Sequence, residues 1–140
     1  LRFELEQAMV NGEVTAEQVP DAWNSKMEEL LNITPPSANL GCMQDMHWTG
    51  TSFGYFPTYA LGNFYSVQLL EAAKAQDASI EAGLNKGDTA PLKAWLGETI
   101  HTHGKKYDPP ELMTKATGRP LDHEPFIRYA KTKFGELYEL

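Results

Sequence analysis

The chain has 140 residues, of which 41% are apolar and 22% charged, a composition typical of a folded globular domain rather than of a disordered segment. Its formal net charge of −7, with no cluster of Lys and Arg, argues against a surface that binds nucleic acid. The single cysteine, Cys42, excludes an internal disulfide and a zinc site made of thiolates, and no apolar run approaches the ~20 residues that a membrane-spanning helix needs.

The first predicted element is a helix from Leu1 to Val10. Its apolar residues Leu1, Leu5 and Met9 share one face because they recur at a helical spacing. Neither an initiator Met nor an N-cap residue precedes this helix, so the chain starts inside an element. We therefore expect the sequence to be a fragment of a longer protein.

A second helix is predicted from Ala22 to Leu31. The sequence from Thr15 to Gln18 before it has the Thr-x-x-Gln form of a capping box. The helix should end before the Pro-Pro pair that begins at Pro35, since residues ahead of proline avoid the helical region. Its expected buried stripe consists of Trp23, Met27, Leu30 and Leu31.

The stretch from Ser37 to Thr58 differs from the rest of the chain. It is rich in Gly, Thr, Ser, Met and aromatic residues, and Asp45 is its only acidic residue. Neither a helical nor an alternating period is present. A long loop of this kind inside a compact domain usually carries function.

Helical patterns resume after this loop and continue to the end of the chain. The last of them should bury one face, which comprises Phe126, Tyr129, Ala130 and Phe134. No strand pattern and no internal repeat is present, so we expect an all-α fold, with residues 1–140 forming a single helical region. The predicted helices cover 59–74, 78–86, 91–103, 109–116 and 122–138.

The loop also holds the residues that could carry chemistry. An imidazole such as that of His47 can donate a hydrogen bond to an anionic oxygen near neutral pH, and Asp45, two residues earlier, could orient the ring. The phenols of Tyr55 and Tyr59 are neutral, rigid hydrogen-bond donors. The alternative is that Asp45 and His47 form a structural hydrogen bond and that the aromatic residues only pack. Residue spacing alone leaves both interpretations open.

A resemblance to a known family favours the first interpretation. The run from Gly41 to Trp48 matches the signature Gly-x-x-Gln-Asp-x-His-Trp of the carboxypeptidase Taq family of metal-dependent carboxypeptidases. Flanking blocks that are similar to this family follow one another in order over nearly the whole chain: Leu1-Arg2-Phe3-Glu4-Leu5-Glu6, Trp23-Asn24, Phe53-Gly54-Tyr55-Phe56-Pro57-Thr58-Tyr59, Ile100-His101-x-His103-Gly104 and the ending from Thr117 to Leu140.

The resemblance implies a role for each candidate residue of the loop. In the family, a metal-activated water attacks the last peptide bond of a substrate that has a free C-terminal carboxylate. By resemblance, His47 would stabilise the oxyanion or contact the substrate backbone, and either Tyr55 or Tyr59 would supply a second donor. Two further members of the signature, Gln44 and Asp45, would brace the loop. The remaining aromatic residue of the signature, Trp48, would pack behind it.

The metal-binding half of such an active site is missing from this sequence. No His-Glu-x-x-His motif is present. On a helix, His101 and His103 would point to different sides, so they cannot grip one ion together, and His123 lies at a predicted helix start. We expect the parent enzyme to bind zinc or cobalt through residues upstream of Leu1, and this chain to bind no metal and to be inactive alone.

The resemblance also implies the nature of the parent protein. It would be a larger, mostly helical, zincin-like metallocarboxypeptidase, of which this chain is the C-terminal part of the catalytic domain. The parent would act on peptide C-termini as a cytoplasmic homodimer, with neither nucleic-acid nor membrane partners. The rival interpretation is a catalytically inactive helical domain with an interaction or structural role.

Overall fold

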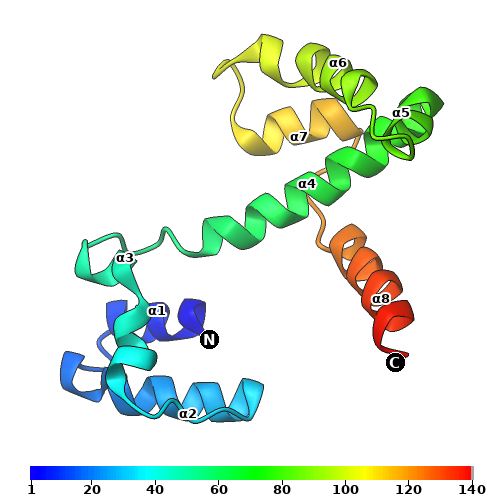
Figure 1. Cartoon of the computed structure of the whole chain (residues 1–140). Coiled ribbons are helices and arrows are strands. Elements are labelled where there is room, and N and C mark those ends of the chain that lie inside the picture. Colours follow the sequence, from blue (N-terminus) through cyan, green and yellow to red (C-terminus); the bar gives the residue numbers. More distant parts are fainter. Residues whose placement is uncertain (140) are drawn as a thin grey trace. The chain divides into compact units, whose positions relative to one another are not determined.

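The computed structural model describes residues 1–139, and within that range it contains helices and turns but no strand, which confirms the all-α fold (Figure 1). The helices are α1 (Arg2–Val10), α2 (Val19–Leu31), α3 (Met46–Thr49), α4 (Pro57–Gln76), α5 (Ala78–Leu84), α6 (Ala90–Thr99), α7 (Pro109–Thr117) and α8 (Glu124–Tyr138). None of the described helices is both long and apolar enough to cross a bilayer. The chain divides into two compact units, Leu1–Tyr59 and the residues from Ala60 onward.

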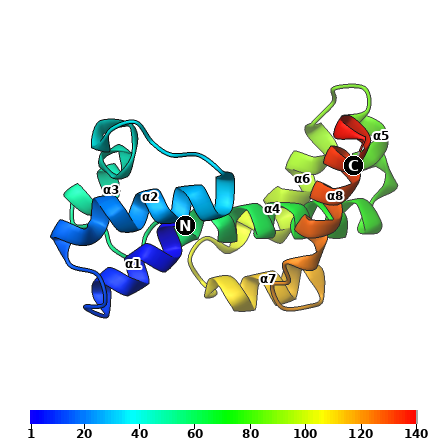
Figure 2. The ribbon, with the colours of Figure 1, turned by 90° about the horizontal axis from the view of Figure 1, so that it is seen from below.

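The first unit is built on the pair α1 and α2, which lie side by side (Figure 2). Its apolar core contains Leu5 from α1 and Trp23 from α2, both buried. On the outside, Lys26 of α2 pairs with Glu4 of α1 at 3.1 Å and with Glu29 of its own helix at 3.0 Å. The hydrogen bond from Lys26 lowers the pKa of Glu4, and the bonds to Glu29 and Glu4 raise the pKa of Lys26.

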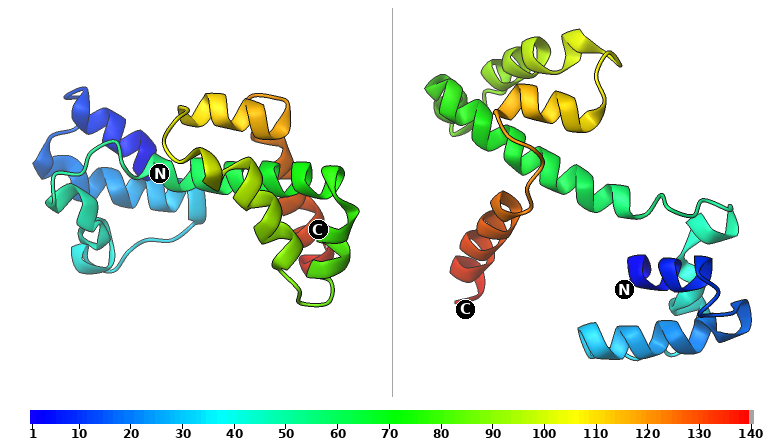
Figure 3. Two further views of the ribbon diagram at one scale, coloured as in Figure 1. Left: turned by 90° about the horizontal axis from the view of Figure 1, so that it is seen from above. Right: turned by 180° about the vertical axis from the view of Figure 1, so that it is seen from behind.

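In the second unit, α5, α6 and α7 gather around the C-terminal half of α4 (Figure 3). The residues at the centre are fully or almost fully buried: Ala73 from α4, Ile80 from α5, and Met113 and Ala116 from α7. Asp77 starts α5 by accepting a hydrogen bond from the Ser79 amide at 2.8 Å.

Two glutamines of α4 connect this core to the segments around it. The buried Gln68 amide donates to the Pro120 carbonyl at 2.9 Å and accepts from the Asp122 amide at 2.8 Å. Eight residues later on α4, the Gln76 side chain donates to the Ala116 carbonyl at 3.2 Å and accepts from the Trp95 indole at 3.0 Å. These side chains form hydrogen bonds with backbone groups at the end of α7 and in the segment between α7 and α8. That segment can therefore pack against α4 without leaving buried backbone groups unpaired.

The sequence predictions were wrong at three places in this fold. The helix expected to reach His103 ends at Thr99, and a 3₁₀ turn follows it. In the described chain Tyr129 and Phe134 of α8 are 45% and 42% exposed, although a buried face was expected there. Two members of the α2 stripe, Leu30 and Leu31, are also exposed, because no part of their own unit covers that end of the helix.

Candidate functional site

The loop that carries the candidate residues is a series of tight turns. Two 3₁₀ turns, Ala38–Leu40 and Cys42–Gln44, precede the single turn α3. Gly41 separates the two 3₁₀ turns at a place with little room for a side chain. A Cβ atom there would lie 3.2 Å from the Pro35 Cβ and 3.4 Å from the Trp23 ring, so glycine favours the close approach of the loop to α2.

Asp45 is the N-cap of α3 and fixes the direction of the residues after it. Its Oδ1 accepts hydrogen bonds from the backbone amides of His47 at 2.8 Å and of Trp48 at 3.3 Å. The residue is only 2% exposed, which is unusual for a carboxylate.

The same carboxylate lies between two cationic or potentially cationic groups. Its Oδ1 is 3.2 Å from Nδ1 of the His47 ring, and its Oδ2 is 3.3 Å from Nε of Arg2 on α1. With Nδ1 turned to Asp45, the Nε2 atom of His47 faces the other way. The contact between Asp45 and His47 is common to both interpretations of their two-residue spacing, the catalytic and the structural one.

Both candidate tyrosines contact the His47 ring, but they do so differently. The Tyr59 hydroxyl oxygen is 3.4 Å from Nε2 of His47. The Tyr55 ring stacks on the imidazole, with centroids 5.7 Å apart and planes at 26°. The side chain of His47 is 21% exposed, while both tyrosines are 52% exposed, so the cluster is open to a ligand.

Chemically, this arrangement offers hydrogen-bond donors at one exposed place. A phenol hydroxyl and an imidazole nitrogen can both donate to an oxygen that carries or develops negative charge. Phe56 closes the cluster with its ring edge against His47, at a centroid distance of 5.3 Å. Since Asp45 holds the ring from behind, the donors are oriented before a ligand arrives.

The two other predicted residues lie outside this cluster. The exposed Gln44 side chain donates a hydrogen bond to the Asn39 carbonyl and so joins the two 3₁₀ turns. The Trp48 ring packs edge-on against Trp23, with centroids 6.0 Å apart. Its buried indole nitrogen makes no hydrogen bond within residues 1–139.

Sequence reasoning missed two charged residues of α1 that hold the loop. One is Arg2, the partner of Asp45. The other is Glu6, which is buried and accepts a hydrogen bond from the Gly54 amide at 2.6 Å. They lie one helical turn apart and face the loop together. The apolar spacing of α1 contained no signal for either role, because charged residues are normally assigned to the solvent side.

The histidines of the second unit do not form a metal site with their surroundings. Within the described part of the chain, no group of three His, Cys, Asp or Glu side chains is placed to hold an ion. The His103 ring instead packs against Tyr107 at 5.2 Å, and both His101 and His123 are exposed. The side chains of residues 1–139 therefore do not fit a catalytic metal.

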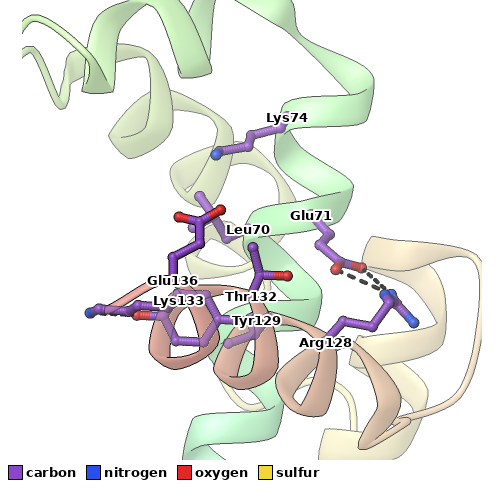
Figure 4. A pocket seen from close by; sticks show the side chains of 9 residues that line it. Leu70, Glu71, Lys74, Arg128, Tyr129, Thr132, Lys133 and Glu136 are labelled. Carbon is purple, nitrogen blue, oxygen red and sulfur yellow. Dashed lines mark hydrogen bonds and ion pairs between the residues drawn. The ribbon is translucent and has the colours of Figure 1, made fainter. Parts of the chain in front are cut away.

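The second unit also has a groove of about 720 Å³ between α4 and α8 (Figure 4). Its lining includes the apolar side chains of Val67 and Leu70 and an ion pair between Arg128 and Glu71, at 3.2 Å. None of the candidate residues of the loop lines it.

Comparison with known proteins identifies relatives over almost the whole chain. The profile of the family described as "Carboxypeptidase Taq (M32) metallopeptidase" matches residues 1–134. Thermostable carboxypeptidase 1 of Pyrococcus furiosus is 44% identical over 96% of the chain, and carboxypeptidase 1 of Bacillus subtilis is 40% identical over 100% of it. The chain spans only 27% and 28% of the lengths of these two proteins.

Solved structures agree with the sequence comparison. The M32 carboxypeptidase from Deinococcus radiodurans matches 99% of the chain with a TM-score of 0.91 at 37% identity, and the match covers 28% of that protein. The carboxypeptidase of Pyrococcus furiosus matches 95% of the chain with a TM-score of 0.89 at 44% identity. The helices and the loop described above are therefore a shared substructure of longer proteins.

Proposed function

The chain belongs to the carboxypeptidase Taq (M32) metallopeptidase family, and on this premise we propose that it supplies the substrate-facing side of a metallocarboxypeptidase active site. The reaction is the release of C-terminal amino acids from peptides. The observation that supports this role is the open pair of His47 and Tyr59, 3.4 Å apart, held from behind by the buried Asp45.

In this proposal the two donors act on the oxygen of the scissile peptide bond. This oxygen gains negative charge when water attacks the carbonyl carbon, and preoriented donors stabilise it more in the transition state than in the substrate. A ring whose Nδ1 donates to Asp45 can also donate from Nε2 when both ring nitrogens carry a proton. The Tyr59 hydroxyl is then free to donate to the same oxygen.

The metal of the enzyme belongs to a different part of the family protein in this proposal. An M32 metallopeptidase uses a metal ion, zinc or cobalt by our expectation, to activate the attacking water. The described residues of this chain offer no ligand set for it. We therefore expect the 140-residue chain to have no peptidase activity alone.

The remaining features of the proposal concern the complete protein. Its substrates would be peptides with a free C-terminal carboxylate, and by family resemblance it would act as a homodimer in the cytoplasm.

The test is a carboxypeptidase assay on the complete gene product that contains these residues. We expect hydrolysis of a peptide with a free C-terminus and none of the same peptide with an amidated C-terminus. The His47→Ala variant should lose about 10²- to 10³-fold in turnover with unchanged metal content, as expected for one lost oxyanion donor. The exposed His123 is the matched control, and His123→Ala should retain full turnover. Equal turnover of the two variants would refute the role of His47.

A further inference from the structure

We propose that Arg2 is a positioning residue, which acts on His47 through the carboxylate of Asp45. The inference rests on the proposed function of His47, because a role for Arg2 in the reaction requires that His47 have one. The contact itself, between α1 and the candidate loop, depends only on the structure of the first unit.

The first reason is that the buried carboxylate of Asp45 needs a positively charged partner. The Asp45 side chain is 0% exposed, and its Oδ1 is occupied by two backbone amides and the His47 ring. Its Oδ2 makes no well-oriented hydrogen bond within residues 1–139 and has only the Arg2 guanidinium beside it, at 3.3 Å. A buried carboxylate without a countercharge is strongly disfavoured, so the Arg2 guanidinium stabilises the Asp45 side chain in its buried position.

The second reason is that Arg2 is itself held in a fixed position. Its guanidinium carbon lies 4.6 Å from the centre of the Phe56 ring and 5.2 Å from that of Trp23. Such stacking suits the planar guanidinium group and restricts its rotamers. The Phe56 ring also contacts His47, so Arg2 supports the imidazole by a second route.

Arg2 and His47 contact different oxygen atoms of the Asp45 carboxylate. Because Arg2 takes Oδ2, the Oδ1 atom remains directed at Nδ1 of His47, and the ring presents Nε2 to Tyr59. Without Arg2, the carboxylate would lose its countercharge and would turn toward solvent. The ring would then lose the acceptor that selects its tautomer and its orientation.

The tautomer of His47 provides a readout that a purely structural role would not change. We would label the 140-residue chain with ¹⁵N-histidine and assign His47 by the loss of its signals in His47→Gln. The ring nitrogen shifts of all variants would then be recorded at one fixed pH. The unaltered chain should give the pattern of a proton fixed on Nδ1. Arg2→Met should move the shifts away from that pattern, whereas Arg2→Lys, which keeps the charge, should largely restore it. The control is Arg128→Met, since Arg128 pairs with Glu71 on an exposed surface.

A double-mutant cycle keeps the proposal testable if Arg2→Met unfolds the first unit. Asp45→Asn retains an oxygen that can cap α3 but removes the charge that Arg2 compensates. The loss of thermal midpoint caused by Arg2→Met should therefore shrink in the Asp45→Asn background. An equal loss in both backgrounds, or an unchanged His47 tautomer in a folded Arg2→Met chain, would overturn the proposal.

These readouts do not depend on peptidase activity. If the expected shifts occur while the complete gene product fails to cleave peptides, the proposed function is refuted and the positioning of His47 by Arg2 through Asp45 stands. If the enzyme is active but the shifts do not respond to Arg2, only the positioning role falls.

Discussion

The Nε2 atom of His47 lies 3.4 Å from the hydroxyl oxygen of Tyr59, while the hydroxyl of Tyr55, whose ring stacks on the same imidazole, makes no such contact. The two tyrosines are equally exposed and only four residues apart. The structure therefore separates two residues that the sequence left equivalent: one brings a hydroxyl to the histidine and the other an aromatic face.

This difference predicts different effects for the two hydroxyl deletions. In the active protein, Tyr59→Phe should lower turnover by about 10²-fold, because a donor to the oxyanion is lost. Tyr55→Phe should change turnover less than about threefold, since the stacked ring remains. Steady-state kinetics of both variants with one peptide is the measurement. The reverse order of the two effects would identify Tyr55 as the donor instead.

The buried Gln68 predicts a large loss of stability in the second unit. Gln68→Ala would leave the Pro120 carbonyl and the Asp122 amide without their partner and should lower the free energy of unfolding by about 2–4 kcal/mol. Gln76→Ala, at an exposed position on the same helix, should cost about 1 kcal/mol. Urea unfolding followed by circular dichroism compares the two. Similar losses would show that burial of Gln68 does not matter.

Replacing two helical glycines by alanine should change the stability of the chain in opposite directions. A Cβ added at Gly83 in α5 would lie 2.9 Å from the Asp88 carbonyl oxygen, a backbone atom that cannot easily move, so Gly83→Ala should destabilise by about 1–3 kcal/mol. Gly62 in α4 has open space around its Cα, and Gly62→Ala should stabilise by about 0.5–1 kcal/mol. Thermal unfolding of the two variants tests both signs. A stabilising Gly83→Ala would contradict the predicted clash.

The exposed apolar face of α8 predicts self-association of the 140-residue chain. Phe134, Leu137 and Tyr138 share one face of α8, and the latter two are 63% and 65% exposed. Exposed apolar patches of this kind favour association. We expect oligomers by light scattering, and fewer of them in Leu137→Lys than in the control Glu136→Lys. A monodisperse monomer at high concentration would count against this prediction.

The sequence was sufficient to predict all the helices except the single turn α3, although not all of their ends, because the signals of helix termini are local. The capping-box pair Thr15 and Gln18 is present, with the Gln18 side chain accepting from the Thr15 amide at 2.9 Å. Pro20 lies in the first turn of α2, and Gly118 ends α7 with a left-handed φ of 77°. Each of these depends on neighbours within one helical turn, so a pattern reveals it.

The supports of the candidate site could not be predicted in the same way. The contact of Asp45 with His47 follows from a spacing of two residues, but its partner Arg2 comes from a different helix. Likewise, Gln68 is buried although a helical pattern assigns glutamine to the surface. Long-range polar contacts leave no periodic signal, because a single charged or amide side chain satisfies them wherever it occurs.

The two contacts from α1 to the candidate loop have a consequence for the order of folding. The bond from the Gly54 amide to Glu6 joins groups 48 positions apart, so it forms only when a long stretch of chain has closed on itself. Closures of such long sequence separation are slow and come late. During synthesis on the ribosome, α1 emerges before the loop, so these contacts cannot form until the loop has also been made, and His47 acquires its final surroundings only when that closure is complete.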